Sequence, residues 1–95
     1  MPNIVLASAL ARWLPAGTDR DAGFPVDGQT LHDALDAAFR HCPALRGYVV
    51  DEHGTLRHHV AVFIDGQALR DKTDLRATAV AADAEIYLLQ ALSGG

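Results

Sequence analysis

The sequence contains a single cysteine, Cys42, so it cannot form an internal disulfide. A small domain without disulfides is typical of a reducing compartment, and we expect a cytoplasmic protein. No apolar run approaches the ~20 residues that a membrane-spanning helix needs. No positively charged segment is followed by the apolar stretch and small-residue cleavage site of a secretion signal. We therefore expect neither a membrane segment nor a leader.

Basic residues and catalytic motifs are also scarce. Lysine and arginine number 8 against 12 acidic residues, and they do not cluster. A net charge of −4 argues against nucleic-acid binding, which normally uses a basic patch. The sequence has no CxxC or HExxH metal motif and no glycine-rich phosphate loop. We expect no catalytic residues, no metal and no bound cofactor, so the chain would not be an enzyme.

The sequence does contain two patterns of apolar residues: some recur at every second position, as in strands, and others recur with the spacing of a helix. Alternation predicts strands at residues 3–10, 24–27, 60–64 and 85–90. Another β-type run begins at Gly47 and meets the run at Val60 after a turn at "EHG". The "DG" after Ile64 is a strong hairpin signal. We expect loops at 15–23 and an irregular or briefly helical stretch at 70–84.

The clearest helix begins after Thr30, a suitable N-cap, and stops at Pro43. Its apolar residues recur with helical spacing along one face. They are Leu31, Ala34, Leu35, Ala38, Phe39 and Cys42. About five strands and one main helix predict an α+β fold, a mixed sheet with the helix packed on one face.

This domain should span residues 1–90, followed by a flexible tail at 91–95. We assign one set of strand residues to the side of the sheet that faces the helix: Val60, Val62, Ile64, Ile86 and Leu88. The alternate set, Ala61, Phe63, Tyr87 and Leu89, should lie on the outer side. Apolar and aromatic residues grouped there predict a partner-binding patch.

The sequence ends in Gly94 and Gly95. Five extended residues reach about 16 Å, far enough to deliver a carboxylate into the active site of another protein. Glycine has no Cβ, so it can enter a narrow channel and leaves the terminal carbonyl open to attack. A carboxylate must be activated before it reacts, most simply as an acyl-adenylate.

Several stretches together resemble the ubiquitin-like sulfur-carrier proteins, the MoaD/ThiS-like β-grasp family. They are "NIVLASAL", "GQTLHDAL" with its stop at "CP", "LRHHVAVFIDGQALR" and "ADAEIYLLQALSGG". The diglycine ending is the specific part of the match. The stretch "VFIDGQALRDKTDL" is most similar to carriers that serve cysteine biosynthesis and sulfur-containing natural products.

The resemblance implies a carrier that partner enzymes act on. A ubiquitin-activating-type adenylyltransferase would use ATP to adenylate Gly95, and a sulfur donor would convert it to a thiocarboxylate. A sulfur-accepting synthase would then take the sulfur.

Three alternatives stay open. The chain could be a ubiquitin-type modifier joined to lysines through Gly95. It could be the small subunit of a molybdopterin-synthase-type complex. It could also be a β-grasp binding module whose glycines are incidental.

Overall fold

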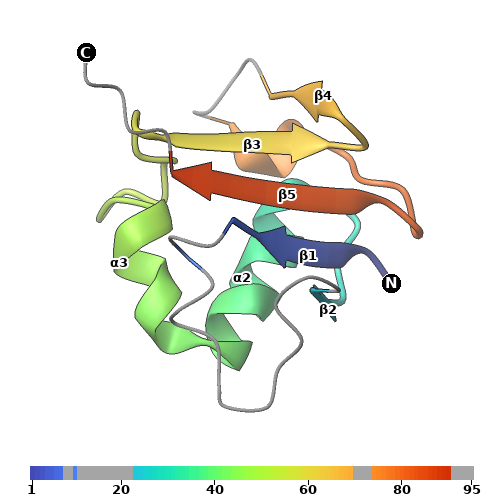
Figure 1. Cartoon of the computed structure of the whole chain (residues 1–95), viewed down its shortest axis with the longest axis horizontal. Helices are drawn as coiled ribbons and strands as arrows, with labels where there is room; N and C mark the ends of the chain where they lie inside the picture. Colours follow the sequence, from blue (N-terminus) through green and yellow to red (C-terminus); the bar gives the residue numbers. More distant parts are fainter. Residues whose placement is uncertain (8–9, 11–22, 70–73, 91–95) are drawn as a thin grey trace.

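The computed structural model describes residues 1–7, 10, 23–69 and 74–90. A five-stranded mixed sheet lies at its centre, in the order β2-β1-β5-β3-β4 (Figure 1). The strands are β1 (Asn3–Leu6), β2 (Phe24–Pro25), β3 (Val60–Ile64), β4 (Gln67–Ala68) and β5 (Glu85–Gln90). β1 is parallel to the central strand β5, and the other neighbouring strands are antiparallel. The predicted α+β class and mixed sheet are confirmed.

The main helix, α2 (Leu31–His41), packs against one face of the sheet and forms as its sequence predicts. Thr30 Oγ1 accepts a hydrogen bond from the backbone nitrogen of Asp33 at 3.2 Å, which satisfies one free N–H of the first turn. The whole predicted apolar stripe is buried, Cys42 included. Each large side chain in it contributes roughly 1.5–3 kcal/mol by leaving water. The helix ends at His41, and Cys42 closes it by donating from its nitrogen to the Ala38 oxygen.

The β-type run predicted from Gly47 is wrong, because the chain is helical there. Pro43 opens a 3₁₀ turn, η1 (Pro43–Leu45), which leads directly into the short helix α3 (Arg46–Val49). Leu45 and Val49 are both fully buried, and their spacing of four residues places them on one helical face. This tertiary packing outweighs the β propensity of the valines. The "EHG" turn itself is confirmed at residues 52–54, and Gly54 has a positive φ of 76°.

The first strand is shorter than predicted. β1 stops at Leu6, and the Leu10 nitrogen donates to the Ala7 oxygen at 2.8 Å, a hydrogen bond that a strand extended to residue 10 could not make. Leu10 lies in the core and is fully buried, like Ile4.

The second strand is also shorter than the predicted range 24–27. Only Phe24 and Pro25 form the ladder with β1, at the edge of the sheet as proline requires. The Val26 nitrogen donates to the Pro2 oxygen, so the extended backbone continues beyond the assigned strand. Of the loop expected at 15–23, only Gly23 lies within the described residues.

The second half of the chain agrees closely with expectation. β3 and β5 have the predicted bounds, and β4 completes a hairpin with β3. Asp65 and Gly66 form its two-residue turn with positive φ values of 51° and 85°, as hairpin turns of this length require. Residues 74–84 are the described part of the stretch predicted to be irregular or briefly helical, and they contain the 3₁₀ turn η2 (Leu75–Ala77), which begins after Asp74.

Candidate functional site: the outer sheet face and the end of β5

The four predicted patch residues lie together on the face of the sheet that α2 does not cover. Ala61 pairs with Leu89, and Phe63 pairs with Tyr87, across the antiparallel strands β3 and β5. Directly opposed residues share a face of the sheet, so the four side chains form one block. Each is partly exposed. Whether a partner binds there stays a prediction.

The alternate residues of the same strands face the helix, as predicted. Val60, Val62, Ile86 and Leu88 are at most 1% exposed, and Ile64 packs against the core at partial exposure. Because side chains alternate along a strand, burying this set turns its neighbours outward.

Two residues that the sequence did not assign extend the patch. Val5 of β1 pairs with Tyr87, and Ala68 of β4 pairs with Phe63. One row of the outer face therefore crosses four strands, from Val5 through Tyr87 and Phe63 to Ala68. The alternation of side chains along β1 is enough to predict that Val5 points away from the core. Only the parallel pairing of β1 with β5 shows that it belongs beside Tyr87.

β5 finishes at Gln90, which pairs with Val60 at the start of β3. Near the end of β5, on the side that faces β1, the Ala7 nitrogen donates to the Leu88 oxygen at 2.9 Å. The patch residue Leu89 is therefore one residue from the end of the strand. The predicted reactive residues Gly94 and Gly95, and the whole tail at 91–95, lie outside the described residues.

A polar turn precedes β3. Asp51 Oδ1 accepts hydrogen bonds from the backbone nitrogens of His53 at 2.9 Å and Thr55 at 3.1 Å. The hydrogen bond from Thr55 is the largest cause that holds the pKa of the Asp51 carboxyl below its usual value of 3.8. His53 and Arg57 lower it further through their charge. The carboxylate thus fixes the turn in its ionised form.

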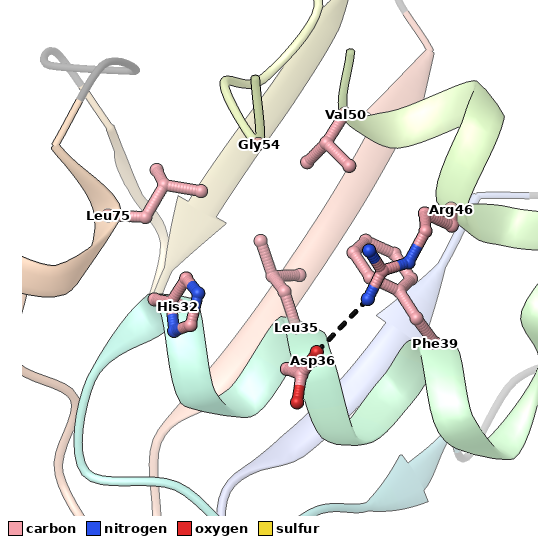
Figure 2. A pocket seen from close by; sticks show the side chains of 8 residues that line it. All are labelled: His32, Leu35, Asp36, Phe39, Arg46, Val50, Gly54 and Leu75. Carbon is pink, nitrogen blue, oxygen red and sulfur yellow. Dashed lines mark hydrogen bonds and ion pairs between the residues drawn. The ribbon is translucent and has the colours of Figure 1, made fainter. Parts of the chain in front are cut away.

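Next to this turn, on the side of the sheet that α2 covers, α2, α3 and Gly54 line a small open cavity of about 50 Å³ (Figure 2). Leu35, Val50 and Leu75 point into it. At its rim, Arg46 forms an ion pair with Asp36 at 3.1 Å, and its guanidinium lies 5.5 Å from the centre of the Phe39 ring. Pockets that hold small molecules usually measure about 300–1,000 Å³, so this cavity is too small for a cofactor.

Cysteine, histidine and carboxylate side chains are possible nucleophiles or metal ligands. Cys42 is buried in the helix stripe. In the ranges that the structure describes, no group of three or more histidine, cysteine, aspartate or glutamate residues could hold a metal ion. Among the helices of those same ranges, none has the length and apolarity needed to cross a bilayer.

Comparison with known proteins places the chain in a family. No family model matches the sequence, and no curated protein sequence matches it. A solved structure does: SAMP1 of Haloferax volcanii, a small archaeal modifier protein, is 35% identical over 99% of this chain and 98% of its own, with a TM-score of 0.73. The chain belongs to the ubiquitin-like β-grasp family of sulfur carriers and modifiers. Its role is accordingly that of a ubiquitin-like carrier or modifier.

More distant members of the ubiquitin-like family share the β-grasp fold. CysO of Mycobacterium tuberculosis is 18% identical, covers 97% of this chain and 100% of its own, and has a TM-score of 0.78. The Amycolatopsis orientalis BexX/CysO complex contains a chain that is 15% identical over the full length of both, also with a TM-score of 0.78. These two matches support the fold alone. The second shows a protein of this fold in complex with a partner protein.

Proposed function

We propose that this chain is a sulfur carrier and cosubstrate that reacts through its last residue, Gly95. An adenylyltransferase joins the Gly95 carboxylate to AMP from ATP and releases pyrophosphate. A sulfur donor then supplies sulfide, which displaces AMP and leaves a thiocarboxylate. The thiocarboxylate sulfur displaces a leaving group from the metabolite held by a synthase, and water then hydrolyses the acyl–sulfur bond, which releases the sulfur-bearing metabolite and restores the carboxylate of Gly95.

The observation that carries this proposal is the ending in Gly94 and Gly95 on a chain whose 35% identity to SAMP1 over 99% of its length places it in a family of sulfur carriers and modifiers. The ending suits the chemistry, because Gly94 and Gly95 add no side chain that would obstruct a channel or shield the carbonyl.

The proposal treats the chain as a substrate of other enzymes. ATP and the catalytic groups belong to the partners, and the chain contributes its terminal carboxylate and a surface by which the partners hold it. The outer patch of Ala61, Phe63, Tyr87 and Leu89 is our candidate for that surface. Two of its residues, Tyr87 and Leu89, belong to β5, the strand that leads into the tail. An enzyme that binds the patch therefore also positions the start of the tail.

Protein modification is a second candidate function. The relative with 35% identity is a modifier by name, whereas the CysO structures are only 15% and 18% identical. The same adenylate would then end as an isopeptide bond between Gly95 and a lysine of another protein.

Intact-mass spectrometry tests the proposal and separates the two candidates. The protein is incubated with ATP, sulfide and the ubiquitin-activating-type adenylyltransferase of its own organism. A mass increase equal to sulfur minus oxygen supports the carrier, and its loss on deletion of Gly95 assigns the site. Gly-Gly remnants on lysines of other cellular proteins, without that mass increase, would support the modifier. A protein that is unchanged in both assays would refute both.

A further inference from the structure

Arg57 joins the short helix α3 to the first residue of β3. Its backbone nitrogen donates to the Val49 oxygen at 3.0 Å, and its side-chain Nε donates to the Gly47 oxygen at 2.8 Å. Its backbone oxygen accepts from the Val60 nitrogen at 3.0 Å. One residue therefore connects the end of a helix with the start of a strand.

The acceptors in α3 are carbonyls that the helix cannot satisfy itself. The last carbonyls of a helix have no intrahelical partner, and α3 has only the four residues Arg46–Val49. Arg57 donates to two of these carbonyls, those of Gly47 and Val49. Val49 and Val60 are both fully buried, so the helix end and the strand start that Arg57 connects lie in the core.

The start of β3 in turn holds the end of β5. Val60, the first residue of β3, pairs with Gln90, the last residue of β5, and Ala61 pairs with Leu89. The arrow of β5 points toward the side of the molecule where α3 lies (Figure 1). β1 pairs with β5 only as far as Leu88. Among the strand pairs that the structure describes, Leu89 and Gln90 are therefore held by β3 alone.

We propose that Arg57 is a positioning residue for the reactive tail. It ties the first residue of β3 to α3, and through the pair of Val60 with Gln90 it fixes the residue from which the chain continues toward Gly95. Without the Nε hydrogen bond, the last pairs between β3 and β5 open more often. The patch residue Leu89 then loses its fixed place opposite Ala61.

This inference rests on the proposed function, in which an adenylyltransferase binds the outer patch and receives the tail. A strand end that is already ordered loses little entropy when an enzyme binds it. A strand end that frays must be ordered during binding, so the complex with the enzyme is weaker. The reaction within the complex is unaffected, because the ordered form is the one that binds.

Two neutral variants of equal length isolate the Nε hydrogen bond. Arg57→Gln places a donor nitrogen at the same number of bonds from the backbone as the arginine Nε. Arg57→Met has a methyl group at that position and donates nothing. Both variants lose the charge that Arg57 presents to Asp51, so their comparison removes any effect of charge.

The assay is ATP–pyrophosphate exchange by the adenylyltransferase that charges the wild-type protein. We expect the KM for Arg57→Met to be about fivefold higher than that for Arg57→Gln, with kcat nearly unchanged, as the loss of one hydrogen bond predicts. Arg46→Met is the control in the same helix, since Arg46 pairs with Asp36 and lies over the Phe39 ring. Its KM should stay near the wild-type value. An equal rise in Arg46→Met would overturn the proposal, because any weakening of α3 would then have the same effect.

Amide hydrogen exchange gives a readout that a general loss of stability would not reproduce. The Ala7 nitrogen donates to the Leu88 oxygen, so the backbone groups of Leu88 face β1 and those of Tyr87 and Leu89 face β3. In Arg57→Met, exchange should accelerate more at the Leu89 amide than at the Tyr87 amide, which lies further inside the same ladder. Equal acceleration at both amides would indicate global destabilisation and would overturn the positioning role.

The kinetic outcomes also separate this inference from the proposed function. Adenylate formation on the wild-type protein, with equal KM values for Arg57→Gln and Arg57→Met, would overturn the inference and leave the carrier function intact. If the enzyme formed no adenylate even on the wild-type protein, the proposed function itself would fail, and this inference with it.

Discussion

Phe63 and Tyr87 lie opposite each other on adjacent antiparallel strands, and they form the centre of a row that runs from Val5 to Ala68 on the uncovered face of the sheet. α2 buries the opposite face of the same strands, so partner contacts made through the sheet fall on this row. A charge introduced beside it tests that expectation.

Ala61→Asp should impair activation without unfolding the protein. The new carboxylate would stand next to Leu89 and would be desolvated when a partner covered the patch. We expect KM in the adenylation assay to rise about tenfold, because a carboxylate buried without a partner weakens binding.

The matched control is Ala82→Asp, which adds the same group at an exposed position before β5. It should leave KM unchanged. Wild-type kinetics for Ala61→Asp, with an unaltered circular dichroism spectrum, would rule out the patch as a docking surface.

Two glycines should respond to alanine with opposite signs. A Cβ on Gly28 would lie 2.6 Å from the Ala34 nitrogen and 2.9 Å from its Cα, both backbone atoms that cannot move aside cheaply. Gly28→Ala should therefore destabilise the protein by about 1–3 kcal/mol, as other overpacking changes do. Gly47 lies in α3, and a Cβ there meets nothing within 4 Å. Gly47→Ala should stabilise the protein by about 0.5–1 kcal/mol through helix propensity.

Urea denaturation of the two glycine variants measures these changes. The pair controls for the substitution itself, since both variants gain one methyl group. A stabilised Gly28→Ala would mean that the approach between the 26–29 segment and the first turn of α2 is looser than the geometry shows.

Asp65 combines a backbone role with a side-chain role in the β3–β4 turn. Its φ of 51° is strained for most residues, and its Oδ1 accepts from the Glu85 nitrogen at 2.9 Å. Asp65→Ala loses both features and should cost about 1–3 kcal/mol. Asp65→Asn tolerates the same φ and retains an acceptor oxygen, so it should cost less than about 1 kcal/mol. Equal losses for the two variants in urea denaturation would show that charge, and not geometry, is what the turn needs.

How far the sequence predicts the fold depends on whether the decisive contacts are local. The helix stripe from Leu31 to Cys42, its Thr30 cap and the Asp65–Gly66 turn are local signals, and the structure confirms all of them. The segment from Gly47 was misread because valines favour strands. Its helix is stabilised by the burial of Leu45 and Val49, and this stabilisation arises only when the rest of the core has assembled.

The candidate site was predictable to the same extent. Alternation along β3 and β5 was enough to group Ala61, Phe63, Tyr87 and Leu89 on one face. The contribution of Val5 required the parallel pairing of β1 with β5, whose partners are more than 80 positions apart in the chain.

Asp51 should give the protein a measurable acid dependence. Its folded-state pKa lies below the usual 3.8, because Thr55 and His53 donate backbone hydrogen bonds to the ionised form. A carboxyl whose pKa is lower in the folded state binds protons more readily when the chain is unfolded. Its stabilising contribution is therefore complete above the unfolded-state pKa and disappears as the pH falls through the folded-state pKa.

Asp51→Asn removes this contribution at every pH, so the free energies of unfolding of the wild type and the variant should differ at pH 7. The difference should shrink as the pH drops below 3.8, since protonation of wild-type Asp51 then removes the same stabilisation. Urea denaturation across this range measures the difference. Asp33→Asn serves as the control, because among the residues that the structure describes the Asp33 carboxylate contacts the His32 ring, at 3.2 Å, and accepts no backbone hydrogen bond. A difference between wild type and Asp51→Asn that stayed constant from pH 7 to below 3.8 would mean that hydrogen bonding to the ionised carboxylate does not stabilise this turn.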